Sequence, residues 1–136
     1  MKILMFYAPS FWYKTYEKVL ETVPEQDIEE SAENAVVVFY HVEAEDVDRE
    51  SKVLSKLIKN LKWLSGKFKT KNLVFHSFNH LSVSKAPAVF SKTLIDAAIE
   101  RLSNSGFEII ETPFGFLNEW KIHVAGHSLA KVFKDL

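Results

Sequence analysis

The sequence contains no cysteine and only four glycines and four prolines. Without thiols the chain forms neither disulfides nor thiolate metal sites, and a reducing cytoplasmic setting is the simplest expectation. The scarcity of glycine and proline argues against disorder, and a hydrophobic content of 47% is enough for a packed core. Because one core of ordinary size accounts for 136 residues, we expect a single domain over residues 1–136.

Long apolar runs and several common motifs are also missing. The apolar run at the start, Ile3 to Tyr7, is too short for a signal peptide or a membrane span, so we expect no membrane association. The absence of GxGxxG, GxxxxGK[ST] and GxSxG leaves dinucleotide, P-loop and serine-hydrolase functions without support. No HExxH occurs, and Gly126 argues against one helix carrying both His123 and His127. We therefore expect no metal and no cofactor.

The net charge of −1 hides an uneven distribution. Residues 17–48 contain eleven acidic side chains and one basic side chain, whereas residues 49–71 contain eight basic side chains and one acidic side chain. A basic band of this kind can bind a polyanion through counterion release. Charge counting alone favours the alternative, a solvated helix face.

The order of strand-like and helix-like segments predicts an α/β domain. Apolar spacing predicts one helix over 53–68, capped by Asp48 or Ser51, and a second helix from Pro87 to 104. Residues 9–34 are acidic and poorly periodic, so we expect a lid over one face there, and a short helical tail from Ser128. Runs of β-branched and aromatic residues predict strands at 2–7, 35–43, 72–78, 107–112 and 119–125. The expected fold is one layered α/β domain with about five strands and two main helices.

Two connections at strand ends are the best candidates for a site: "FNHLS" (78–82) and "TPFGF" (112–116). Loops at strand ends of α/β domains bring polar groups and free N–H donors to a ligand. His80 can bind a substrate hydroxyl or orient a water, but the sequence alone favours a histidine that caps its loop or is satisfied by backbone. Gly115 allows close approach to a ligand or a positive φ, which a tight turn requires just as much.

Together with "KIHVAGHSLA" (121–130), these two segments resemble the N-terminal editing domain of archaeal threonyl-tRNA synthetases. That domain is similar in fold to the D-aminoacyl-tRNA deacylases. The resemblance extends to "FYHVE" (39–43), to the opening strand and to both helices. It implies a cytoplasmic homodimer that hydrolyses the ester bond of serine mischarged on threonine tRNA, without a metal. It also implies a synthetase catalytic domain as a partner, in the same chain or in another. Such proofreading is needed because serine lacks only one methyl group of threonine, and a synthetase pocket gains only about 1–3 kcal/mol of discrimination from that difference.

The resemblance also implies roles for particular residues. His80 and Asn118 are expected to orient the tRNA 3′ end and the attacking water, and backbone N–H groups near Asn79 and Gly115 are candidate oxyanion donors. The lysines expected to contact the RNA backbone are Lys52, Lys56, Lys59 and Lys62. The residues expected to surround the substrate are Val42, Glu43, Phe78, Asn79, Pro113, Phe114, Gly115, Phe116 and Leu117.

The chain departs from the family pattern at the site itself. Leu117 and Asn118 stand where the family has tyrosine and lysine, and Lys131 stands where it has an acidic residue. Lys121 cannot replace the missing lysine, because it lies on the opposite face of the strand from Asn118. Asn118 can hydrogen-bond a water or a ribose hydroxyl but carries no charge.

Three functions therefore stay open. The first is a retuned deacylase, and the second is a tRNA-binding or dimerisation module that has lost the reaction. The third, D-aminoacyl-tRNA deacylation, ranks lower because the related family has glycine-proline where this chain has Pro113-Phe114-Gly115.

Overall fold

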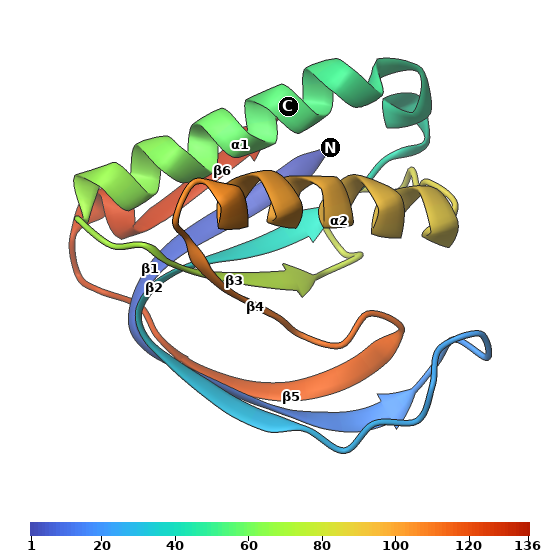
Figure 1. Cartoon of the computed structure of the whole chain (residues 1–136), viewed down its shortest axis with the longest axis horizontal. Coiled ribbons are helices and arrows are strands. Elements are labelled where there is room, and N and C mark those ends of the chain that lie inside the picture. The colour runs from blue at the N-terminus through green and yellow to red at the C-terminus, as the bar shows by residue number, and fades with distance from the viewer.

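The computed structural model describes residues 1–136 and contains six strands, two α-helices and two short 3-10 helices (Figure 1). The helical elements are α1 (Glu50–Lys67), α2 (Ala88–Asn104), η1 (Ala44–Arg49) and η2 (Ser128–Ala130). The strands are β1 (Lys2–Lys18), β2 (Glu29–His41), β3 (Asn72–Ser77), β4 (Glu108–Glu111), β5 (Phe116–His123) and β6 (Lys131–Asp135). The predicted α/β class and both main helices are confirmed. Neither helix is long and apolar enough to cross a membrane.

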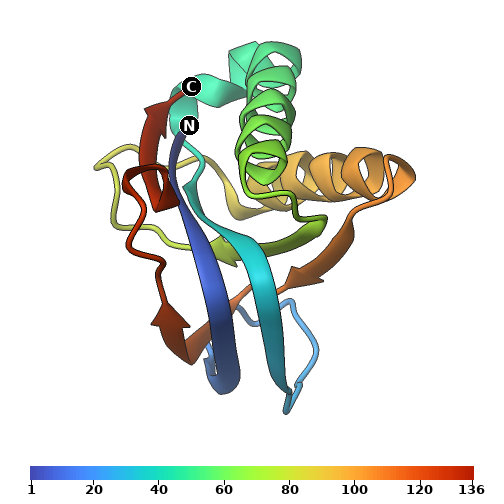
Figure 2. The ribbon, with the colours of Figure 1, turned by 90° about the vertical axis from the view of Figure 1, so that its left-hand side faces the viewer.

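All six strands belong to one mixed sheet of order β4-β3-β2-β1-β5, with β6 also paired to β1. β1 and β2 form an antiparallel hairpin, while α1 and α2 are the crossovers that make β3 and β4 parallel to β2. β5 pairs with the distal part of β1, and β6 pairs with its first residues. β5 and the distal ends of β1 and β2 curl beneath the rest of the sheet (Figures 1 and 2).

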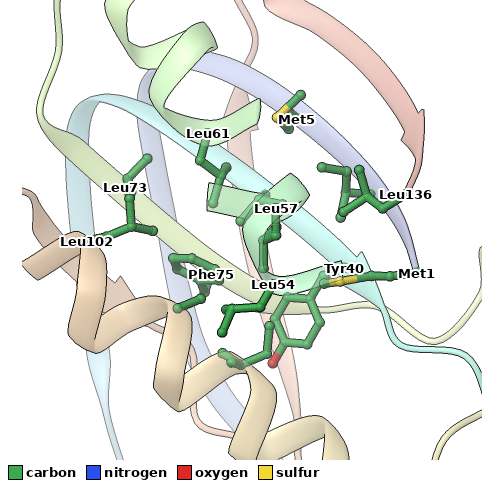
Figure 3. Close-up of a cluster of buried hydrophobic side chains, with 14 of the residues drawn as sticks. Met1, Met5, Tyr40, Leu54, Leu57, Leu61, Leu73, Phe75, Leu102 and Leu136 are labelled. Atoms are coloured by element: carbon green, nitrogen blue, oxygen red, sulfur yellow. The ribbon is translucent and has the colours of Figure 1, made fainter. Parts of the chain in front are cut away.

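The curled sheet has a hydrophobic core on each face. Tyr40 and its alternate neighbours on β2 face the helices and pack with Leu57 and others in a cluster of 20 buried residues (Figure 3). Val37 and Phe39 point the other way, into a second cluster of seven buried residues inside the curl. Because both faces are covered, β2 is buried at every position from Ala35 to His41, which explains its continuous apolar sequence.

The lid predicted over residues 9–34 is wrong. β1 continues to Lys18 and β2 already begins at Glu29, so only residues 19–28 form a loop. The distal part of β1 pairs with β2 on one side and with β5 on the other. Its backbone groups are therefore satisfied by distant segments, although its own side chains give no strand signal.

The predicted helical tail is also wrong. Only Ser128–Ala130 is helical, and Lys131–Asp135 adds a sixth strand along the free edge of β1. α1 follows η1 directly, so neither Asp48 nor Ser51 caps it. These are errors of boundary and pairing, because the helix itself lies where its periodicity predicts it.

Candidate functional site

A cavity of about 390 Å³ lies at the carboxyl end of β3, between the start of α2, the β1–β2 loop and the turn before β5. Both connections singled out from the sequence contribute to its walls. The predicted site residues that line it are Val42, Phe78, Asn79, His80, Phe114, Gly115, Phe116, Leu117 and Asn118. The structure thus brings these residues together, while their roles stay predictions.

Two predicted site residues lie elsewhere. Pro113 lines a neighbouring cavity of about 620 Å³. Glu43 accepts hydrogen bonds from the Met1 amine (3.0 Å), Lys2 Nζ (2.8 Å) and Ser82 Oγ (2.7 Å). Burial alone would raise the pKa of Glu43, but these hydrogen bonds outweigh it and lower the pKa to about 2. Glu43 is therefore a charged anchor for the loop before α2 and does not line the cavity.

The loop before α2, residues 78–87, is fastened to the end of β2 by a second polar side chain. His41 is fully buried, its Nδ1 accepts from the Leu81 N–H (3.2 Å), and its Nε2 lies 2.6 Å from the Ser84 carbonyl oxygen. An accepting Nδ1 carries no proton, so the Nε2–H donates to Ser84. These two hydrogen bonds hold the loop to the end of β2, and the same loop places His80 in the cavity wall.

The turn before β5 requires glycine at its centre. Gly115 has φ +83°, and a Cβ there would lie 3.0 Å from Val23 Cγ1. Its carbonyl accepts from the Val19 and Leu20 N–H groups (2.8 and 3.2 Å), which seats the β1–β2 loop on the turn. No backbone carbonyl accepts from the N–H of Gly115 or of Asn79. Both N–H groups therefore stay candidates for binding a ligand oxygen.

Asn118 presents an unpaired acceptor. Its Nδ2 donates weakly to the Phe116 carbonyl (3.4 Å), while Oδ1 is buried without a hydrogen-bond partner. An unpaired buried acceptor costs about 1–3 kcal/mol. Lys121 and Lys131 do not line the cavity, because Lys121 lies over the Trp12 ring and Lys131 bonds the Ala125 carbonyl. Neither lysine replaces the one missing at position 118.

Several lining residues were not predicted from the sequence, among them His76, Lys85 and Trp120. Burial lowers the pKa of His76 to about 4, so this imidazole is neutral at neutral pH. Lys85 is exposed and forms no ion pair. No Asp, Glu or Arg lines the cavity, so Lys85 is the one lysine that brings a formal charge to its wall.

The structure contains no group of three or more His, Cys, Asp or Glu side chains that could hold a metal ion.

The four lysines predicted to bind RNA do not all lie on the same side of α1. Lys52, Lys56 and Lys59 recur at helical spacing along one side of α1 and form no ion pairs. Lys62 instead lines a separate cavity of about 460 Å³ with Lys69 and Lys71. The outer side of α1 therefore carries three free cations.

The chain is thus an α/β domain with a curled mixed sheet and a carboxylate-free cavity at the carboxyl end of β3. Residues 1–136 match the family described as the archaea-specific editing domain of threonyl-tRNA synthetase, and the chain belongs to this family. The resemblance seen in the sequence motifs is confirmed.

The relatives include whole ligases. The threonine–tRNA ligase of Hyperthermus butylicus is 31% identical over 99% of this chain and 23% of the ligase. Those of Caldivirga maquilingensis and Thermococcus onnurineus are 30% and 25% identical over 100% of this chain, and over 23% and 22% of their own lengths. The chain thus spans less than a quarter of these relatives.

Among solved structures, a c-Myc DNA unwinding element binding protein matches with a TM-score of 0.69. The two chains are 13% identical, and the match covers 100% of this chain and 99% of the other. At this identity the likeness concerns the fold alone.

Proposed function

We propose that this domain hydrolyses serine mischarged on threonine tRNA, in the cytoplasm and in association with a threonine–tRNA ligase. Membership of the editing-domain family supports hydrolysis of a misacylated tRNA. The observation that carries the proposal is the cavity in which His80, Asn118 and the free N–H of Gly115 meet. A ligase site that accepts threonine rejects serine poorly, so a second, hydrolytic site raises fidelity.

The proposed reaction is attack of water on the ester carbonyl that joins serine to the terminal ribose. The N–H groups of Asn79 and Gly115 stabilise the oxyanion that develops on the carbonyl oxygen. Asn118 hydrogen-bonds a ribose hydroxyl and His80 orients the water, whose proton passes to the departing ribose oxygen. The carbon–oxygen ester bond breaks, releasing serine and a tRNA with a free 3′ end. The vicinal ribose hydroxyl of the substrate assists in activating the water.

Lys85 is the candidate for the positive charge that Asn118 lacks. It lines the cavity from the loop before α2, and no carboxylate lines the cavity to neutralise it. An ammonium at this position attracts the terminal phosphate or the developing oxyanion. The cation of the site would then come from a different element than in the family pattern.

A deacylation time course tests the proposal. Threonine tRNA charged with serine should lose it rapidly, whereas threonyl-tRNA and a D-aminoacyl-tRNA should decay at the spontaneous ester rate. His80→Ala combined with Asn118→Ala should slow serine release, while His123→Ala, an exposed residue outside the cavity, should not. Unchanged release by the double variant would rule out these two roles and leave a mechanism based on backbone groups and the substrate.

A second candidate function is a catalytically weak or inactive module that binds tRNA or mediates homodimerisation. The departures at Leu117, Asn118 and Lys131 and the free lysines of α1 favour it. Binding of threonine tRNA without turnover would support this function. Sedimentation of the domain tests the dimer, which we propose from the family resemblance. Rapid release of only the D-amino acid would instead support the third function, D-aminoacyl-tRNA deacylation.

A further inference from the structure

His76 is a buried imidazole in the cavity wall that the proposed mechanism does not use. It is 5% exposed and lines the cavity from β3. Aromatic rings surround it, with centroid distances of 4.8 Å to Phe39, 6.5 Å to Phe78 and 6.0 Å to Trp120. The imidazole is therefore surrounded by aromatic rings within the cavity wall.

The hydrogen bonds of Thr112 determine which nitrogen carries the proton. The single hydroxyl proton of Thr112 donates to the Phe75 carbonyl (3.3 Å), and the same oxygen lies 2.9 Å from His76 Nδ1. With its proton directed to the Phe75 carbonyl the hydroxyl accepts at Nδ1, and we assign on this basis the tautomer in which Nδ1 is protonated and Nε2 carries a lone pair. Burial, which lowers the pKa of His76 to about 4, keeps this neutral form at physiological pH.

The same contact determines where that lone pair points. Thr112 is 3% exposed and does not line the cavity, so Nδ1 faces the protein interior. Nε2 lies across the ring from Nδ1 and is the nitrogen left for the cavity. The hydrogen bond of the His76 side chain is made by Nδ1, and no protein group bonds to Nε2.

We propose that His76 Nε2 is a ligand-binding atom that accepts a hydrogen bond from an O–H or N–H donor at the aminoacyl end of the tRNA. The inference rests on the proposed function, and it adds a binding residue that the family motifs do not contain. Two donors have this chemistry: the serine hydroxyl and the α-ammonium, which the aromatic faces also attract. A base whose conjugate acid has a pKa near 4 takes up protons poorly, so His76 binds and orients the ligand and is not the general base.

The test measures affinity for a non-hydrolysable probe, 3′-amino-3′-deoxyadenosine carrying a serine or an alanine in amide linkage. His76→Phe keeps an aromatic ring but removes the acceptor, and should weaken binding of the serine probe about 5- to 150-fold, the range of one unpaired buried group. His76→Gln restores an acceptor and should bind more tightly than His76→Phe. Thr112→Val removes the partner of Nδ1 and should also weaken binding. His123→Phe, outside the cavity, should bind like the wild type.

The outcomes separate this inference from the proposed function. A loss confined to the serine probe identifies the hydroxyl as the donor, and an equal loss for the alanine probe identifies the ammonium; both support the inference. Wild-type affinity in a folded His76→Phe protein overturns it while the proposed function stands. If His76→Phe does not fold, wild-type binding by Thr112→Val overturns the inference. A wild-type domain that binds neither probe overturns the proposed function as well.

Discussion

Burial of the His76 side chain sets how the stability of the domain responds to mild acid. Its pKa is about 4 in the folded chain against an ordinary value of 6.5, so between these values the unfolded chain binds more protons. The free energy of unfolding should therefore fall as the pH drops from 6.5 towards 4, by roughly 3 kcal/mol in all at about 1.4 kcal/mol per pKa unit. Urea unfolding of wild type and His76→Phe at pH 7 and 4.5 checks this.

The His76→Phe protein should lose less stability over that interval than the wild type, and an equal loss in both would contradict the assignment. Glu43 does not confuse the comparison. Its pKa of about 2 lies below the ordinary value of 4.5, so its contribution is present above pH 4.5 and is lost only below it.

Gly115 and Gly66 make a matched pair for testing the turn before β5. Gly115→Ala places a side chain at φ +83° and 3.0 Å from Val23, and should destabilise the fold by about 1–3 kcal/mol. Gly66 lies in α1 with no atom within 4 Å of an added Cβ, so Gly66→Ala should be neutral or stabilising by up to about 1 kcal/mol. Chemical unfolding measures both. Equal stability of the two variants would refute the argument for Gly115.

Single residues also show how far the sequence predicts the site. The motif residues around His80 and Gly115 line the cavity because they directly adjoin strand ends, which converge in this class of fold. Glu43 follows a strand too, but its partners Lys2 and Ser82 are distant in sequence and turn it away from the cavity. His76 was missed because a histidine within an apolar strand gives no local sign of which face it occupies.

At the scale of an element, the loop over residues 78–87 depends on His41. His41→Leu leaves the Leu81 N–H and the Ser84 carbonyl unpaired, which should cost about 1–3 kcal/mol. Hydrogen exchange should rise across the loop and stay unchanged in α1. His127→Leu, which removes a local bond of an exposed histidine to Leu129, should leave the loop protected. Unchanged exchange in the His41→Leu loop would mean that the Glu43–Ser82 contact suffices.

Helices and strands could be predicted where the side-chain pattern of the segment itself indicates them. Both helices follow from apolar spacing, and β2 follows from a run buried on two faces. The distal half of β1 and all of β6 were not predictable in this way, because each exists by pairing with a strand far along the chain. These residues form strands because they pair with a neighbouring strand of the sheet, and their side-chain pattern does not indicate it.

At the scale of the whole molecule, opposite charges occupy different parts of the fold. The hairpin of β1 and β2 curls away from the helices (Figure 1). Seven acidic residues lie between Glu17 and Glu33 of this hairpin, whereas α1 carries five lysines and one glutamate. The net charge of −1 therefore coexists with a basic helix. We expect the acceptor stem of a bound tRNA to lie towards α1, because the acidic residues of the hairpin repel phosphate, while its 3′ end reaches the cavity beside the β1–β2 loop.

Removing two of these charges tests that orientation. Lys52→Gln with Lys59→Gln should weaken threonine tRNA binding and make the dependence of log affinity on log salt shallower by about 1–2, close to one for each lost phosphate contact. Lys14→Gln with Lys121→Gln, on the curled part of the sheet, removes equal charge and should change the slope little. Affinity for the serine probe should be unaffected in both, because neither pair lines the cavity. Equal slopes for the two variants would mean that net charge, and not the face of α1, governs RNA binding.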